Sequence, residues 1–322
     1  MKKLTILIPT YNRKDYLLST LKNIFCNGHL GEYDLVISDN HSDYDIKKEI
    51  ETVFSSDFTS NITINQWPFN VGMSTNLAIS FFLPKTHWCL MLSDDDVLND
   101  HLLDKVFLDI EKYDSSCAIK YSIEGCEKHI DGDLQNISDF SDYYKDKRRA
   151  GDKMYLAMLY NLQILHPYLS YMTIYSYTYL SFLVALLKCL EEKKGGIHTS
   201  SFIAFHYQVH NEVSFKKSQT SYLRTVLGIR TIDDVIMTFK GENRKKLKKA
   251  IFTDVIEADR LYKSLVQIED KEEGRSFYKK LKNYIQNKGI KTITFKTIYN
   301  LYYYTNINLF TIIDRVRNRK KG

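Results

Sequence analysis

Three consecutive carboxylates, Asp94, Asp95 and Asp96, are the side chains of this chain best suited to hold a cation. They follow an apolar run, residues 88–92, that has the length and composition of a buried strand. Like charges at a strand end repel one another unless a cation or several hydrogen-bond donors compensate them. A divalent ion bound by one or two carboxylates, with water and substrate phosphates in its other positions, meets that requirement. The alternative is a solvated acidic turn that caps the following helix, since Asp is a favourable residue at a helix start.

The elements that must position these carboxylates can be predicted from the apolar pattern. Four strands are predicted at residues 4–9, 33–38, 62–65 and 88–92, and helical spacing of apolar residues follows the first and third of them. This alternation predicts an α/β fold with a mostly parallel sheet and right-handed crossovers. Ligands of such sheets bind outside the carboxyl ends of the strands. All four predicted ends carry polar residues, namely Thr10-Tyr11-Asn12-Arg13, Asp39, the segment 70–76 and the acidic triplet.

Four motifs at these strand ends together resemble those of the family 2 glycosyltransferases, which have the GT-A nucleotide-sugar fold. They are Ile8-Pro9-Thr10-Tyr11-Asn12-Arg13, Asp39-Asn40-x-Ser42-x-Asp43, Asn70-x-Gly72-x3-Asn76 and Ser93-Asp94-Asp95-Asp96. The match covers about residues 2 to 125 well and the rest of the chain weakly. It implies a GT-A, Rossmann-like mixed sheet, mostly parallel and flanked by helices, and transfer of a sugar with inversion at the anomeric carbon.

The resemblance also implies the roles of individual residues. It implies nucleotide contacts at Pro9, Thr10, Tyr11, Arg13, Asp39, Asn70 and Asp94, and metal ligands at Asp95 and Asp96. The implied cofactor is Mn²⁺ or Mg²⁺, which stabilises negative charge on a departing diphosphate. Asp39 is expected to accept the imino N–H of a uracil, and Arg13 lies near a helix start, where phosphate binding is favoured. Many members carry Asp where this chain has Ser93, so which two of the three carboxylates face the site stays open.

Each of these residues also has a structural alternative. Tyr11 can pack against the sheet edge, Arg13 can be a solvated residue of the first helical turn, and Asp39 can cap a helix. Asn70 belongs to an Asn-x-Gly sequence, which suits an ordinary turn.

A catalytic base for inverting transfer must be a carboxylate or an imidazole within hydrogen-bond reach of the acceptor hydroxyl. The second half of the chain offers Glu191, Glu192, His198, His206 and His210. His198 follows Gly195-Gly196-Ile197, and we take it as the candidate base because a flexible loop after an apolar helix suits an acceptor site. The alternative is a structural or solvated histidine.

Charge divides the chain near residue 241. Residues 241–322 hold 20 Lys and Arg against 9 Asp and Glu, a net charge of +11, so residues 1–240 carry −5 of the total of +6. We predict a GT-A domain over residues 1–240, with a nucleotide-binding half at about 1–125 and an acceptor half at about 126–240, followed by a basic helical extension, 241–322. Apolar and aromatic residues among these charges favour contact with an anionic membrane surface. A plain structural appendage is the main alternative, and nucleic acid is not expected, because no binding-module signature is visible.

One uncharged segment, residues 168–187, has the length of a membrane helix. Its Ser, Thr and Tyr content favours instead a strand over 169–175 and a buried helix over 182–187. The five cysteines show neither disulfide nor zinc spacing, and the first apolar run is too short for a signal peptide. We therefore expect a cytoplasmic enzyme, peripheral at the inner face of the cytoplasmic membrane.

The predicted function is transfer of a sugar, from a donor expected to be UDP-linked, to a carbohydrate or lipid-linked glycan in bacterial capsule or lipopolysaccharide synthesis. A sugar nucleotidyltransferase uses a related sheet, but it would have a Gly-rich loop with Lys or Arg after the first strand, where this chain has Thr10-Tyr11-Asn12-Arg13. A non-catalytic membrane-associated scaffold is the other alternative, and it would need neither the acidic triplet nor Asp39.

Overall fold

The computed structural model describes residues 2–124, 130–144, 158–178, 180–206 and 232–252, together with residues 272, 275, 276, 278 and 279. The chain divides into two compact units: Met1–Val209 with Ile232–Thr253, and His210–Thr231 with Asp254–Gly322. Nearly all of the described residues belong to the first unit, and the elements below are those of that unit.

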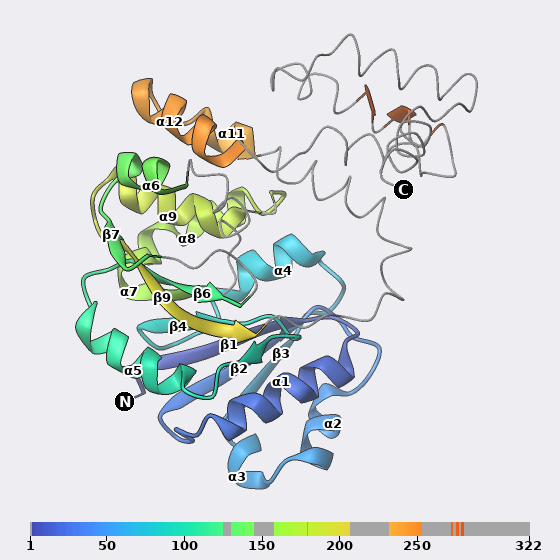
Figure 1. Cartoon of the computed structure of the whole chain (residues 1–322). Coiled ribbons are helices and arrows are strands. Elements are labelled where there is room, and N and C mark those ends of the chain that lie inside the picture. Colours follow the sequence, from blue (N-terminus) through green and yellow to red (C-terminus); the bar gives the residue numbers. More distant parts are fainter. Residues whose placement is uncertain are drawn as a thin grey trace, which may run out of the picture. The chain divides into compact units, whose positions relative to one another are not determined.

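The first unit is built on a mixed sheet of nine strands (Figure 1). The strands are β1 Leu4–Thr10, β2 Tyr33–Asp39, β3 Ile62–Gln66, β4 Trp88–Met91, β5 Val97–Leu98, β6 Ala118–Ile123, β7 Gly132–Leu134, β8 Met158–Asn161 and β9 Ile197–His206. Their order is β3-β2-β1-β4-β8-β6-β9-β5, with β7 paired to β9. β1 to β4 pair in parallel, β8 is antiparallel to β4 and β6, and β6 is parallel to β9. The predicted mostly parallel sheet is therefore confirmed, and β1, β2, β4, β6 and β9 all end at the same edge.

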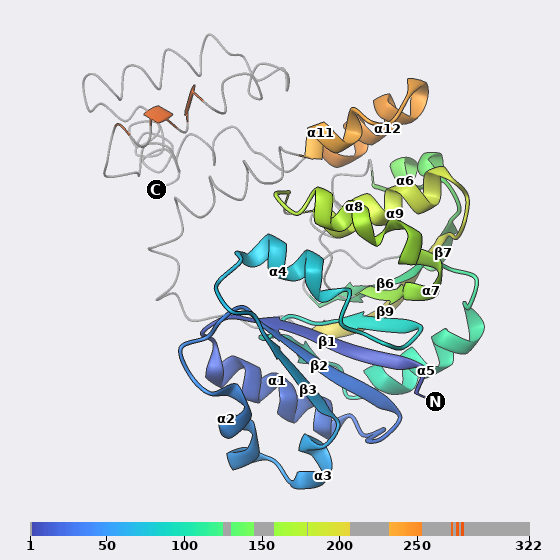
Figure 2. The ribbon, with the colours of Figure 1, turned by 180° about the vertical axis from the view of Figure 1, so that it is seen from behind.

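Helices cover both faces of this sheet. They are α1 Lys14–Cys26, α2 Ile46–Val53, α3 Ser56–Thr59, α4 Met73–Ser80, α5 Leu102–Lys112, α6 Ile137–Tyr144, α7 Leu162–Leu165, the 3₁₀ helix η3 His166–Tyr168, α8 Leu169–Ile174, α9 Ser181–Glu191, α11 Ile232–Ile236 and α12 Gly241–Phe252. Helices α1, α2, α3 and α5 lie on one side of the sheet, and α4, α8 and α9 lie on the other (Figures 1 and 2).

The core between the sheet and α1 fixes the start of that helix. Alternate residues of β1, including Ile6 and Ile8, belong to the same buried cluster as Leu17, Leu21 and Ile24 of α1. The period of two along the strand and the i, i+4, i+7 spacing along the helix each bring one apolar face to this contact. Fully burying such a side chain contributes about 1.5–3 kcal/mol. The first turn of α1 is thereby held at the carboxyl edge of the sheet.

The strand predicted over residues 169–175 is wrong, because these residues form α8 and a turn after it. Leu169 and Met172 are buried three positions apart, as on one helix face, and η3 before them begins with a Pro in its first turn. Strand propensity of Tyr and Thr was overridden by this packing. The buried helix predicted over 182–187 is confirmed within α9. Among the described residues, no helix has both the length and the apolar character needed to cross a membrane.

Helix α12 is the first part of the predicted basic extension. Leu247 and Ala250 are fully buried, as the helical pattern predicts, and Lys246 Nζ donates to Ser138 Oγ of α6 at 2.9 Å. Residues 241–252 thus pack within the first unit. Most of the remaining extension, including the segment 290–322, lies outside the described residues.

Candidate active site

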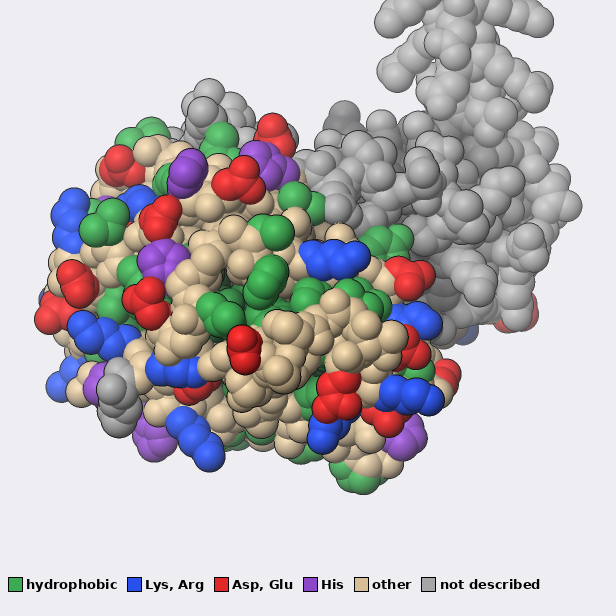
Figure 3. Space-filling view, turned by 90° about the horizontal axis from the view of Figure 1, so that it is seen from below, with side chains coloured by type: hydrophobic (Ala, Val, Ile, Leu, Met, Phe, Trp, Pro, Cys, Tyr) green, Lys and Arg blue, Asp and Glu red, His purple; other side chains and the backbone are tan. Residues whose placement is uncertain are grey.

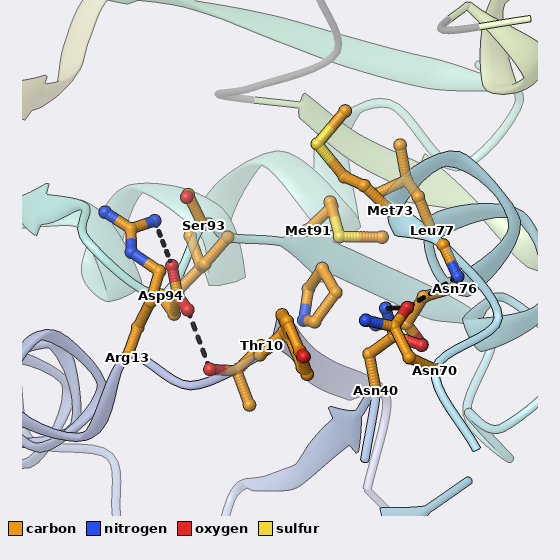
Figure 4. A pocket seen from close by; sticks show the side chains of 14 residues that line it. Thr10, Arg13, Asn40, Asn70, Met73, Asn76, Leu77, Met91, Ser93 and Asp94 are labelled. Carbon is orange, nitrogen blue, oxygen red and sulfur yellow. Dashed lines mark hydrogen bonds and ion pairs between the residues drawn. The ribbon is translucent and has the colours of Figure 1, made fainter. Parts of the chain in front are cut away.

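A pocket of about 460 Å³ opens at the carboxyl edge of the sheet (Figure 4). The residues that line it come from the ends of β1 and β4 and the turns after them, from the turn after β2, and from the segment between β3 and α4 with the first turns of α4. They are Pro9, Thr10, Tyr11, Arg13, Asn40, Asn70, Gly72, Met73, Asn76, Leu77, Met91, Leu92, Ser93 and Asp94. The structure therefore brings six of the seven proposed nucleotide contacts to one cavity. The seventh, Asp39, does not line it. These segments are far apart in sequence, and the parallel order β2-β1-β4 places their ends side by side.

One arginine joins two members of the acidic triplet. Arg13 Nη1 donates to Asp94 Oδ1 at 2.7 Å, and Nη2 donates to Asp95 Oδ2. Thr10 Oγ1 donates to the other oxygen of Asp94 at 2.7 Å (Figure 4). Because one planar guanidinium contacts both carboxylates, an oxygen of Asp94 and an oxygen of Asp95 lie close together and face the same cationic group. Burial raises the pKa of Asp94, and the charge of Arg13 and the hydrogen bond from Thr10 oppose that rise.

Asp96 points elsewhere and holds the turn. Its Oδ2 accepts a hydrogen bond from the Ser93 backbone N–H at 2.6 Å. Thr20 of α1 donates to the backbone oxygens of Asp94 and Asp96 at 3.0 and 3.1 Å, which ties the turn to the helix. Burial of the carboxylate raises the pKa of Asp96 to about 7, an effect that the charge of Lys120 on β6 partly opposes.

The donor set of the triplet fits a hard divalent cation. Carboxylate oxygens are the ligands that Mg²⁺ and Mn²⁺ prefer, and Mg²⁺ takes one or two of them together with substrate phosphates. The guanidinium of Arg13 balances the negative charges of Asp94 and Asp95 from one position between them. A metal cation at that position would balance the same two charges. No group of three or more His, Cys, Asp or Glu within the described part of the chain is arranged to hold a metal ion.

Asp39 supports the pocket from behind and does not line it. The carboxylate is fully buried. It accepts hydrogen bonds from the N–H and Oγ of Ser42 at 3.0 and 2.6 Å and from Gln66 Nε2 at 2.9 Å. These contacts close the turn after β2. Asp39 does not cap a helix, since the N-cap of α2 is Asp45.

Asn40, to which the sequence reasoning gave no role, stands on the pocket wall instead of Asp39. Its Nδ2 donates to Asn70 Oδ1 at 2.9 Å, and its Oδ1 accepts from the Val71 N–H at 2.8 Å. Asn70 Oδ1 also accepts from the N–H of Gly72 at 2.8 Å, and Gly72 has φ +86°, which favours glycine. The only sequence signal for Asn40 was its place beside Asp39 in the second motif.

His198 lies in β9, so the loop predicted there is wrong. It pairs with Ile119 at the amino end of β6, away from the edge that carries the pocket. Its Nδ1 lies 2.9 Å from Asp133 Oδ1, and its ring stacks on Tyr113 with centroids 3.8 Å apart. The structure thus does not bring His198 to the pocket.

The glycine pair before His198 serves close packing. A Cβ at Gly195 would come 3.0 Å from the Cys117 backbone nitrogen, and one at Gly196 would come 2.8 Å from the Gln135 side chain. Two glycines in sequence were interpreted as a flexible loop, but here they let neighbouring segments approach each other.

The other candidate bases are distributed as follows. Glu191 and Glu192 are bound at the end of α9, to Lys188 at 3.0 Å and to the Tyr168 hydroxyl at 2.7 Å. His206 ends β9 at the carboxyl edge. His210 lies outside the described residues.

The sheet order, the pocket at its carboxyl edge and the acidic turn after β4 define a GT-A-type glycosyltransferase. Residues 5–177 match Glycosyl transferase family 2, and the chain belongs to this family of enzymes, which use nucleotide-sugar donors.

Two solved structures show the same fold at low sequence identity. TarS 1–349 of S. aureus, in complex with UDP-GlcNAc, is 13% identical with a TM-score of 0.56, over 91% of this chain and 83% of that one. The mannosyltransferase PcManGT of Pyrobaculum calidifontis, in complex with GDP-Man and Mn²⁺, is 12% identical with a TM-score of 0.55, over 96% and 87%. No curated protein matches the chain.

Proposed function

We propose that this enzyme transfers a sugar from a UDP-linked donor, with inversion, to a carbohydrate or lipid-linked glycan of a bacterial surface polysaccharide such as capsule or lipopolysaccharide. The observation that carries the proposal is the cluster at the pocket in which Thr10 and Arg13 hold Asp94 and Asp95. It joins the first and fourth motifs in one place, and it combines an anion-binding group with cation-binding groups. A diphosphate carrying a divalent metal needs both.

The pocket suits a nucleoside. Its volume of about 460 Å³ lies within the range of small-molecule sites. Tyr11 is 41% exposed, so a base can lie against its ring. The amides of Asn40 and Asn70 offer both donors and acceptors, which a uracil edge requires. The complexes of TarS with UDP-GlcNAc and of PcManGT with GDP-Man are in keeping with a nucleotide-sugar donor, and the choice of UDP is our proposal.

Arg13 and the acidic turn suit the diphosphate. The guanidinium presents a planar fork that matches phosphate oxygens, and it stands at the first turn of the 13-residue helix α1, whose N–H groups favour anions. Asp95 is the foremost proposed metal ligand. The sequence paired it with Asp96, but Asp96 is held by the Ser93 N–H, whereas Asp94 and Asp95 share the Arg13 guanidinium. We therefore propose Asp94 as the second carboxylate within reach of the metal, at the end of the pocket where the nucleotide diphosphate would lie. When bound, Mn²⁺ or Mg²⁺ supplies charge stabilisation for the departing diphosphate.

The proposed surroundings of the enzyme rest on the charge pattern. The +11 charge of residues 241–322 and their aromatic content support docking on an anionic membrane surface, where a lipid-linked acceptor would be presented. On the face seen in Figure 3, basic and acidic side chains of the described residues are interspersed. This supports the expectation that nucleic acid is not a partner.

Nucleotide release from a panel of UDP-, GDP-, CMP- and dTDP-sugars, with and without Mn²⁺, tests the proposal. We expect release from a UDP-sugar that requires the metal and is lost in Asp95→Asn. The matched control is Asp100→Asn, which removes an exposed carboxylate a few residues further along the chain. Release that is indifferent to EDTA would contradict the metal role, and preference for another nucleotide would contradict the UDP assignment.

A further inference from the structure

The three asparagines of the pocket differ in what they can offer a ligand. Asn76 is buried in the wall: its Oδ1 accepts from Trp67 Nε1 at 2.8 Å, and its Nδ2 donates to the Ser38 backbone oxygen at 3.1 Å. Asn40 is 3% exposed and joins the wall to the segment before α4. Asn70 is exposed at the same end of the pocket (Figure 4). An incoming molecule therefore reaches the amide of Asn70 most readily.

Backbone contacts fix the orientation of the Asn40 and Asn70 amides. A backbone N–H can only donate, so the amide atom that it meets is an oxygen. The Val71 N–H meets Asn40 at 2.8 Å, which makes that atom Oδ1 and leaves Nδ2 to face Asn70 at 2.9 Å. The Gly72 N–H meets Asn70 at 2.8 Å and identifies its Oδ1 in the same way. The turn between β3 and α4 thus determines where each amide carries its donors.

The two amides have different hydrogen-bonding capacity left. An amide oxygen accepts two hydrogen bonds, and Asn70 Oδ1 already has two, from Asn40 Nδ2 and from the Gly72 N–H. Neither N–H of Asn70 Nδ2 has a partner within the described part of the chain. Asn40 Oδ1 accepts one hydrogen bond and keeps a second lone pair. Of these two amides, Asn70 therefore offers donors only, and the remaining acceptor belongs to Asn40.

Uracil and cytosine differ in the groups that these amides would meet. In uracil the carbonyl oxygen O4 stands next to an imino N–H, so an acceptor adjoins a donor. In cytosine an amino group stands next to a ring nitrogen that accepts, so the order is reversed. A donor at Asn70 beside an acceptor at Asn40 matches the order in uracil. Against cytosine, the N–H groups of Asn70 and of the base would face each other unpaired, which weakens binding.

We propose that Asn70 determines the choice of nucleobase by donating to O4 of uracil, an inference that rests on the proposed function. Tyr11 offers a ring face against which any base can lie, so it does not distinguish one pyrimidine from the other. Asn70 cannot turn its oxygen to the ligand without breaking two hydrogen bonds. Asp39, which was expected to bind the base, accepts from Ser42 and Gln66 behind the wall. Selection between bases thus falls to the segment before α4.

Binding of UDP and CDP in the presence of Mn²⁺, measured by calorimetry, tests the inference. Wild type should bind UDP about 10- to 100-fold more tightly than CDP. Asn70→Asp keeps an oxygen for the contacts with Asn40 and Gly72 and replaces the N–H groups by a second oxygen, which can accept from the amino group of cytosine. The preference should therefore reverse in favour of CDP. The base of dTDP has the same O4, so dTDP should lose affinity by the same factor as UDP.

Asn99→Asp is the matched control. Asn99 Oδ1 accepts from the His101 N–H at 3.0 Å, two residues further on, as Asn70 Oδ1 accepts from Gly72, and Asn99 does not line the pocket. The variant adds the same charge in the same kind of turn, so the ratio of the UDP and CDP affinities should not change. If Asn70→Asp weakens UDP and CDP equally, so that its ratio equals that of Asn99→Asp, the inference is overturned.

Two UDP analogues test the same contact in the wild-type protein, so the result does not depend on the folding of a variant. Sulfur is a weaker hydrogen-bond acceptor than oxygen. UDP with sulfur in place of O4 should bind about 10-fold more weakly than UDP, and UDP with sulfur in place of O2 should bind like UDP. Equal affinities of UDP and the O4 analogue would overturn the inference and leave a UDP-dependent transferase standing. Wild type that binds neither UDP nor CDP would refute the proposed function and this inference with it.

Discussion

Replacing Arg13 should make the acidic turn a better site for free Mn²⁺. In the structure the guanidinium compensates Asp94 and Asp95, so a cation that takes these carboxylates must displace it. A hydrogen bond to a charged group contributes about 1.5–3 kcal/mol. The Arg13 side chain is 37% exposed, and solvent screening reduces the sum of its two contacts to about 1–2 kcal/mol. Arg13→Met should therefore bind Mn²⁺ about 5- to 30-fold more tightly without nucleotide.

The same substitution should have the opposite effect on the nucleotide. If Arg13 turns from the carboxylates to the diphosphate on donor binding, Arg13→Met should bind UDP more weakly than wild type at saturating Mn²⁺. Electron paramagnetic resonance of free Mn²⁺ measures the first affinity, and calorimetry with UDP measures the second. The two shifts in opposite directions distinguish a displaced arginine from a general loss of structure.

Lys14→Met is the matched control. Lys14 is the next residue, carries the same charge and pairs with Glu49 at 3.6 Å rather than with the triplet. It should change the Mn²⁺ affinity by less than about twofold, because exposed pairs contribute little. If the Mn²⁺ affinity of Arg13→Met equals that of Lys14→Met or is weaker, the hypothesis that the Arg13 guanidinium and Mn²⁺ compete for the same two carboxylates is refuted.

The remaining predictions concern the triplet, the turn after β2 and the C-terminal extension. Asp95→Asn should abolish metal-dependent UDP binding in calorimetry with little change in Tm, and full binding would remove Asp95 from the site. Asp39→Ala leaves the N–H and hydroxyl of Ser42 without their acceptor, which should cost about 1–3 kcal/mol of unfolding free energy in urea and weaken the affinity for the sugar nucleotide; an unchanged affinity for the sugar nucleotide would leave Asp39 only a support of the turn. The pKa of Asp96 is raised from 3.8 to about 7, so the folded state keeps a proton that the unfolded state has lost. Metal-free stability should therefore fall as pH rises from about 4 to 7, and Asp96→Asn should remove that slope. Binding to vesicles should rise with anionic lipid, fall with salt and weaken on deletion of residues 290–322, whereas equal binding to neutral vesicles would make the extension structural.

The sequence by itself determined the elements and the edge at which the chemistry occurs. The period-two and helical patterns up to residue 92 predicted β1 to β4 and the helices α1 and α4, because an apolar stripe has to face a core in any fold built from these segments. Polar residues at all four strand ends then indicated the binding edge, since parallel strands end on the same side. The same logic brought Thr10, Arg13 and Asp94 to one pocket.

Only the tertiary structure decided which side chain at each strand end faces the ligand. Adjacent residues of a strand end point in opposite directions, so register and turn contacts placed Asn40 on the wall and buried Asp39 behind it. The two histidines of β9 differ for the same kind of reason. No local pattern distinguishes His198 from His206. The pairing of β9 with β6 puts His198 near the amino end of β6, and its pairing with β5 puts His206 beside Val97 at the carboxyl edge. Contacts between segments distant in sequence decided these positions, and periodicity along one segment carries no information about them.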